Sequence, residues 1–141
     1  MENEQEKSTT FFRFEDLRIY HKSIEYVDQV FAMAKQTGND PFTKSFFDRY
    51  LTSANGISMN IAEGSSRNKS QFVYYLKMAK SSVRECVVLS SVALNRNFIS
   101  KEAYEESKTQ LMEMTKMIGA LIGSLQRSVK SDERSMEEDD E

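Results

Sequence analysis

Residues 58–76 read SMNIAEGSSRNKSQFVYYL, and they hold the end of one expected helix, a short polar corner and the start of the next helix. Gly64 is expected to end the first helix, since glycine is unfavourable in a helix interior. Asn68 and Gln71 stand three residues apart, as in a capping box, so the second helix is expected to begin at Lys69. This stretch therefore predicts two helices joined by a tight turn.

The polar residues of this corner have two interpretations. In the structural one, Asn60 and Glu63 hydrogen-bond the backbone of the corner or pair with Arg67, and so fix the direction of the next helix. In the functional one, the same three residues lie on a surface that meets a partner. We favour the structural interpretation, with the corner defined by Asn60, Glu63 and Gly64.

The rest of the chain also carries helical signals, because apolar residues recur every three or four positions. Gly38 suits a left-handed helix end, Asp40 can cap the next helix, and Pro41 suits its first position. Ser100 is expected to cap the last helix. The expected helices span about 15–37, 41–63, 69–95 and 101–128.

Short connections make sequential helices antiparallel neighbours. The sequence therefore predicts an all-α fold, an antiparallel up-down-up-down four-helix bundle over residues 11–130. Residues 1–10 and the acidic residues 131–141 are expected to be disordered tails.

Two of the expected helices have more apolar surface than one core can cover. The first helix has a stripe expected to be buried and a second one beside it: Leu17, Tyr20, Ile24, Val27, Phe31 and Ala34, then Ile19, Tyr26, Val30 and Met33. Residues 86–94, CVVLSSVAL, are apolar on nearly every face of the third helix, whose inner stripe is expected to run from Phe72 to Ala93. These excess faces predict self-association.

Charge is distributed unevenly along the chain of 141 residues. The net charge is −3, to which residues 1–9 contribute −2 and residues 131–141 contribute −6, leaving +5 for residues 10–130. A basic body is compatible with a nucleic-acid partner. The start of the chain is unlike a signal peptide and no apolar run is long enough to span a bilayer, so a cytoplasmic location is expected.

The residue types that usually carry chemistry are sparse. His21 is the single histidine, and Cys86 is the single cysteine and lies within an apolar stripe. No phosphate-binding loop is present in the sequence, and the adjacent carboxylates Glu15–Asp16 and Glu105–Glu106 do not resemble the Glu and Glu-x-x-His pattern of di-iron bundles. We therefore expect no catalytic, cofactor-binding or metal-binding residues, and an enzyme is the least favoured hypothesis.

Basic residues form a second candidate site. Lys77, Lys80 and Arg84 share one face of the third expected helix, and Tyr74 can add a stacking surface. With two corner cations they could neutralise several phosphates, with little sequence preference. The alternative is an ordinary solvated helix face. The candidate contact residues are Arg67, Lys69, Tyr74, Lys77, Lys80 and Arg84.

Four segments together resemble the 23S rRNA-intervening-sequence proteins, a bacterial family: FRFEDLRIYHKS (12–23), NIAEGSSR (60–67), SQFVYYLKMAKSSVRE (70–85) and FISKEAYEE (98–106). The resemblance covers about residues 12–128. It implies a short antiparallel four-helix bundle, in some members a homopentameric ring, with no known catalytic residue. A related branch serves as accessory proteins of diversity-generating retroelements, which bind a reverse transcriptase and nucleic acid.

The chain departs from the family pattern in three places. Ser58 stands where a proline is usual, Leu51 and Thr52 stand where a basic pair is common, and the acidic tail is additional. We expect a non-enzymatic homo-oligomer, pentameric by resemblance, that associates with RNA or DNA and needs no cofactor or membrane. The alternative is a protein-interaction scaffold or accessory subunit, for example of a reverse transcriptase.

Overall fold

The computed structural model describes residues 11–140, so the expected disordered tail at 1–10 and the last residue lie outside the described chain. A short 3-10 helix, η1, is followed by four α-helices. The elements are η1 (Arg13–Asp16), α2 (Arg18–Lys35), α3 (Pro41–Ser65), α4 (Lys69–Asn95) and α5 (Lys101–Asp140).

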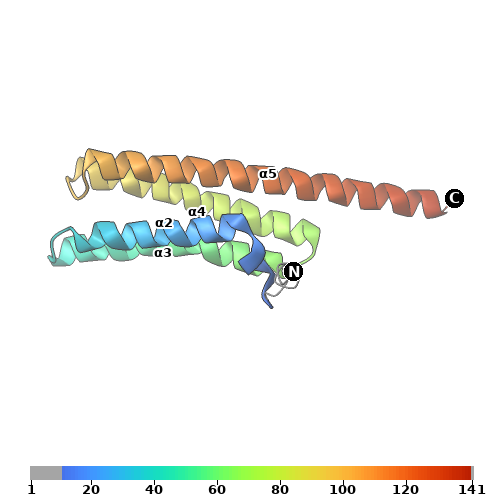
Figure 1. Ribbon diagram of the computed structural model, residues 1–141, viewed down its shortest axis with the longest axis horizontal. Coiled ribbons are helices and arrows are strands. Elements are labelled where there is room, and N and C mark those ends of the chain that lie inside the picture. Colours follow the sequence, from blue (N-terminus) through green and yellow to red (C-terminus); the bar gives the residue numbers. More distant parts are fainter. Residues whose placement is uncertain (1–10, 141) are drawn as a thin grey trace, which may run out of the picture.

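The helices form a four-helix bundle, as predicted, and the described residues contain no strand. The α2–α3 and α4–α5 connections lie at one end and the α3–α4 corner at the other, so sequential helices run in opposite directions (Figure 1). Each helix packs against two others, α2 and α4 both lying against α3 and α5. The short helix η1 packs on α2 and α3 at the corner end.

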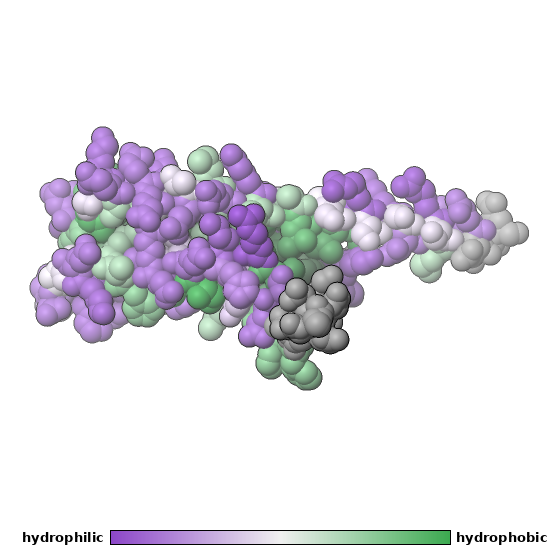
Figure 2. All heavy atoms as spheres, in the orientation of Figure 1, coloured by the Kyte–Doolittle hydropathy of each residue, from purple (hydrophilic) through white to green (hydrophobic). Residues whose placement is uncertain are grey.

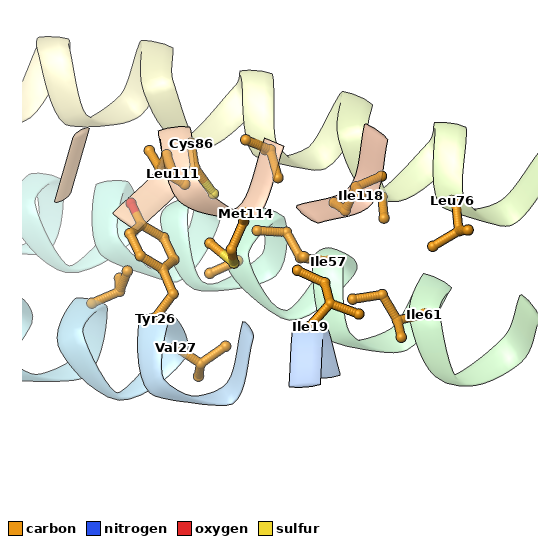
Figure 3. Packing of buried hydrophobic residues seen from close by; sticks show 14 of the residues in the cluster. Ile19, Tyr26, Val27, Ile57, Ile61, Leu76, Cys86, Leu111, Met114 and Ile118 are labelled. Atoms are coloured by element: carbon orange, nitrogen blue, oxygen red, sulfur yellow. The ribbon is translucent and has the colours of Figure 1, made fainter. Parts of the chain in front are cut away.

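The core lies between all four helices (Figure 3). The inner stripe predicted for α4 is confirmed, because all of its members are buried: Phe72, Leu76, Ala79, Val83, Cys86, Ser90 and Ala93. On α5 the buried apolar residues recur at helical spacing and are Leu111, Met114, Ile118 and Ile122.

The prediction for the first helix is wrong about which face is buried. The core side of α2 carries the stripe that contains Tyr26 and Val30, both fully buried. Of the stripe expected to be inside, only Val27 is buried, whereas Ile24 is 37% exposed and Phe31 is 51% exposed. Both stripes are apolar, and the choice between them follows from Tyr26, whose hydroxyl has hydrogen-bond partners only towards the other three helices.

Capping residues start α3 and α4 where the sequence predicts, whereas α2 begins at Arg18 rather than near residue 15 and has no side-chain cap. Asp40 Oδ1 accepts hydrogen bonds from the backbone N–H groups of Phe42 and Thr43, each at 3.1 Å. Asn68 Oδ1 accepts from Gln71 N at 2.9 Å, which starts α4 at Lys69. These bonds satisfy amide groups that a helix N-terminus leaves unpaired.

Two glycine predictions need correction. Gly38 has no positive φ; in the described chain the left-handed residue is Asn97, between α4 and α5, with φ 61°. Gly64 does not end α3, which continues to Ser65. Its role is close packing, because a Cβ atom there would lie 2.7 Å from Tyr75 Cβ.

The last helix is much longer than expected. We predict an end near residue 128 and a disordered tail over 131–141, whereas α5 continues to Asp140. After Gly123 the segment holds no glycine or proline, and ten of its 18 residues are Leu, Gln, Arg, Lys, Met or Glu, which favour helix. A contact from Lys69 of α4 to Ser128 and Asp132 also holds this part of α5. It therefore projects beyond the corner (Figure 1).

Candidate nucleic-acid interface

The corner is held by an ion pair between Glu63, in the last turn of α3, and Arg67, just after the helix ends. Arg67 Nε donates to Glu63 Oε2 at 2.9 Å, and this hydrogen bond raises the pKa of the arginine above its ordinary value. The guanidinium also lies over the ring of Tyr75, 5.3 Å from its centroid. The pairing expected between Glu63 and Arg67 is therefore present.

The other corner residues also make contacts inside the chain. Asn60 Nδ2 donates to Gly56 O at 2.8 Å, one turn earlier in α3 rather than at the turn itself. Gly64 is buried against Phe72 and Tyr75 of α4. The Gly64 contact holds α3 close to α4, whereas the Asn60 hydrogen bond lies within α3.

Lys69 is engaged by α5. Its Nζ donates to Ser128 Oγ at 2.6 Å and to Asp132 Oδ2 at 3.0 Å. Both corner cations of the candidate site, Arg67 and Lys69, are thus already paired with a carboxylate. A phosphate would compete with these carboxylates, although each pair is exposed and such pairs are weak.

The remaining candidates lie along α4. Lys77 and Arg84 are exposed, Lys80 is half-buried, and Tyr74 is 58% exposed. Within residues 11–138 none of the three cations forms an ion pair, and Arg84 Nη2 donates only to Ser81 Oγ at 3.1 Å. From Lys77 to Arg84 the row spans about 10 Å of helix. We call Lys77, Lys80 and Arg84 the α4 row.

A buried cluster of hydroxyl groups was missed by the sequence analysis. Tyr26, Tyr50, Ser90 and Ser107 come from α2, α3, α4 and α5, and all four are fully buried. Successive oxygens around this hydroxyl ring lie 2.7, 2.6, 2.7 and 2.8 Å apart. The available signal was a polar residue within each buried stripe.

The buried titratable groups are held in their neutral forms. Burial raises the pKa of the Cys86 thiol to about 12 and also raises the pKa values of Tyr26 and Tyr50. A thiol with so high a pKa is a poor nucleophile at neutral pH. His21 Nε2 lies 2.6 Å from the backbone oxygen of Glu15, at the surface.

Among the described residues, no three metal-ligating side chains come together in a group that could hold an ion. In the same part of the chain, no helix combines the length and apolar character needed to cross a membrane.

Comparisons with known proteins agree with the four-helix fold. The sequence profile of 23S rRNA-intervening sequence proteins matches residues 15–120. A crystal structure of a protein of unknown function, from the S23 ribosomal protein family of Bacteroides thetaiotaomicron, superposes with a TM-score of 0.69. The two are 21% identical, the match covers 74% of this chain and 95% of the other, and at this identity it shows the fold alone. No curated protein shows significant similarity to the chain.

Proposed function

The chain belongs to the family of 23S rRNA-intervening sequence proteins, and on this premise we propose that it is a non-enzymatic homo-oligomer that binds RNA or DNA. The α4 row is the observation that carries the proposal. Its three cations follow one another along a single helix, and no carboxylate of residues 11–138 pairs with them. Such a row attracts a phosphate backbone irrespective of base sequence.

Tyr74 supports the same surface. Its ring is exposed one turn before Lys77, and an exposed aromatic ring can stack on an unpaired base. This favours a single-stranded nucleic acid over a duplex. The corner cations contribute less, because Arg67 and Lys69 already have acidic partners.

Exposed apolar side chains support self-association. On α4 they include Met78, Val88 and Val92, and on α2 they include Ile24 and Phe31. Apolar stripes of this kind on a small soluble bundle are typical of surfaces that contact another subunit. We propose that these faces meet when copies associate side by side.

Fluorescence anisotropy with a labelled single-stranded RNA tests nucleic-acid binding. Replacing the α4 row by glutamine (Lys77→Gln, Lys80→Gln, Arg84→Gln) is expected to weaken binding at least about tenfold at low salt. The dependence of log Kd on log salt should also fall by about 2, since a single strand releases about 0.7 counterion per phosphate contact. A labelled DNA duplex measured in parallel shows whether a single strand is preferred.

The matched control removes three exposed cations elsewhere, with Arg18→Gln, Lys35→Gln and Lys44→Gln. Its net charge equals that of the row variant, so a general charge effect would weaken both equally. Equal weakening, or no binding by the wild-type chain at low salt, would refute the proposed site.

A second candidate function is that of a scaffold or accessory subunit, for example of a reverse transcriptase. The exposed apolar residues of α4 favour it, since Val88 and Met78 offer a surface for another protein. Light scattering of the purified chain separates the candidates. A strict monomer that binds RNA would contradict self-association, and an oligomer that binds no nucleic acid would favour the scaffold.

A further inference from the structure

The end of α5 and the α3–α4 corner enclose a notch. We call residues 129–140 the overhang, because this part of α5 continues beyond the corner (Figure 1). The notch has a volume of about 710 Å³. Apolar residues gather where the overhang leaves the bundle (Figure 2), and the apolar side chains of the notch are Leu17, Phe72, Leu121, Leu125, Val129 and Met136.

The two sides of the notch carry opposite charges. Arg13, Arg67 and Lys69 line the bundle side, which we call the floor, whereas Asp132 and Glu133 line the overhang. Arg67 and Lys69 pair with Glu63 and Asp132 of their own chain, but these pairs are exposed and weak, so the carboxylates of a second copy can replace or extend them. The N-terminus of α4 also lies at the floor and adds partial positive charge. The 3.0 Å contact between Lys69 and Asp132 shows that the opposite charges of the two sides are within ion-pair range.

The overhang is poorly stabilised by its own chain. Glu137 and Glu138, which we call the tip, are exposed carboxylates near the end of α5, and the last turn of this helix has no basic residue. Carboxylates at a helix C-terminus oppose the helix dipole, so this tip favours a partner that supplies cations. Met136 is 67% exposed on the same segment.

We propose that a second copy of this chain fills the notch, with the two overhangs lying antiparallel. Interfaces related by a two-fold axis require a surface that is complementary to itself. The notch meets this requirement, because an apolar helix stands beside an apolar groove and an acidic tip stands beside a basic floor. The tip of each copy contacts the floor of the other, and each Met136 enters the other copy's notch.

The charges distinguish a second copy from other occupants. A nucleic acid would meet Asp132 and Glu133, and a cationic helix would meet Arg13, Arg67 and Lys69. A fitting partner must carry both charges in the reverse order, as a second copy does. This contact is end to end and does not depend on the side-by-side association proposed above.

Sedimentation velocity of the full chain over a range of concentrations tests the contact, using two charge reversals. The tip variant carries Glu137→Lys and Glu138→Lys, and the floor variant carries Arg13→Glu and Arg67→Glu; all four positions are exposed. Each variant alone places like charges in contact. Its dimer dissociation constant is therefore expected to rise at least about tenfold above that of the wild type. Circular dichroism verifies that both variants remain folded.

Mixing the two variants provides the decisive measurement. In a mixed dimer the lysine tip of the tip variant meets the glutamate floor of the floor variant, and the acidic tip of the floor variant meets the basic floor of the tip variant. Both contacts are attractive, so the dissociation constant of the mixed dimer is expected to lie within about threefold of the wild-type value. A contact within one chain cannot be restored by mixing. A mixture that stays monomeric would overturn the proposal. So would a wild-type chain that sediments with the same mass as each variant alone.

The same series in a Val88→Glu background separates this contact from side-by-side association. If the exposed apolar faces of α2 and α4 associate, Val88→Glu disrupts that association, and the end-to-end equilibrium between monomer and dimer remains. If they do not, the background behaves as the wild type and the end-to-end step is still measured. Either result leaves the charge-reversal outcome interpretable.

Discussion

The inner and outer faces of α4 differ in a way that hydropathy alone would not suggest. Ser90 is fully buried on the inner face, whereas Val88, two residues earlier, is 61% exposed on the outer face. The polar residue is therefore inside and the apolar residue outside. The difference shows that burial in this bundle is decided by available partners as well as by the polarity of a side chain.

The inner face accepts a serine because its hydroxyl has partners. Ser90 Oγ lies 2.6 Å from the Tyr50 hydroxyl and 2.7 Å from Ser107 Oγ. These hydrogen bonds offset the free-energy cost of removing the serine hydroxyl from water. The outer face has no such local compensation for its apolar residues. Val88 gains only if another chain covers it.

The largest expected effect comes from breaking the inner face. Ser90→Ala removes one partner from each of the Tyr50 and Ser107 hydroxyls, which keep Tyr26 as a partner, and should lower the free energy of unfolding by about 2 kcal/mol. Urea denaturation measures the change. Ser91→Ala is the control, because its hydroxyl bonds Val87 O within α4, and it should change stability by less than about 0.5 kcal/mol. Equal losses would mean that the hydroxyl ring adds nothing.

An intermediate effect is expected from alkaline pH. Burial raises the pKa of Cys86 from 9.0 to about 12, so above pH 9 the unfolded chain loses a proton that the folded chain keeps. Stability therefore falls as pH rises, by about 1.4 kcal/mol at pH 10 from this thiol, with Tyr26 and Tyr50 adding to the loss at higher pH.

Urea denaturation at pH 8, 9 and 10 measures this slope. Cys86→Ala removes the thiol, so its stability should change less between pH 8 and pH 10, although its stability at pH 8 is lower. A slope unchanged by the substitution would assign the pH dependence to other groups.

The smallest effect on stability is expected on the outer face. Val88→Glu should change the unfolding free energy of the dissociated chain by less than about 0.5 kcal/mol, because the residue touches little of the core. Light scattering should nevertheless show loss of side-by-side association. A loss of stability as large as that for Ser90→Ala would mean that the two faces do not differ as described.

Local patterns account for much of the fold. The α4 stripe, including Ser90, and the caps at Asp40 and Asn68 follow from spacing within a few residues, and the structure has them as predicted. The face of α2 could not be chosen in this way, because both stripes are apolar and the choice depends on hydroxyls from three other helices.

In the candidate site, too, contacts between residues close in sequence could be predicted and contacts between distant residues could not. Glu63 and Arg67 are four residues apart across the end of α3, so sequence spacing suggests their pair. Lys69 and Asp132 are 63 residues apart, and their contact arises only because α5 continues past the corner. The acidic composition of 131–141 suggests a solvated tail, whereas helix-favouring residues and this contact give a helix.

The hydroxyl ring has a consequence for how the helices are aligned along the bundle axis. Each helix contributes one hydroxyl at the same level, so a helix that slipped by one turn, about 5.4 Å, would withdraw its hydroxyl from both neighbours. Apolar stripes alone tolerate such a slip, because one turn brings another apolar residue into the same place. The ring thus fixes the axial register of all four helices at a single point.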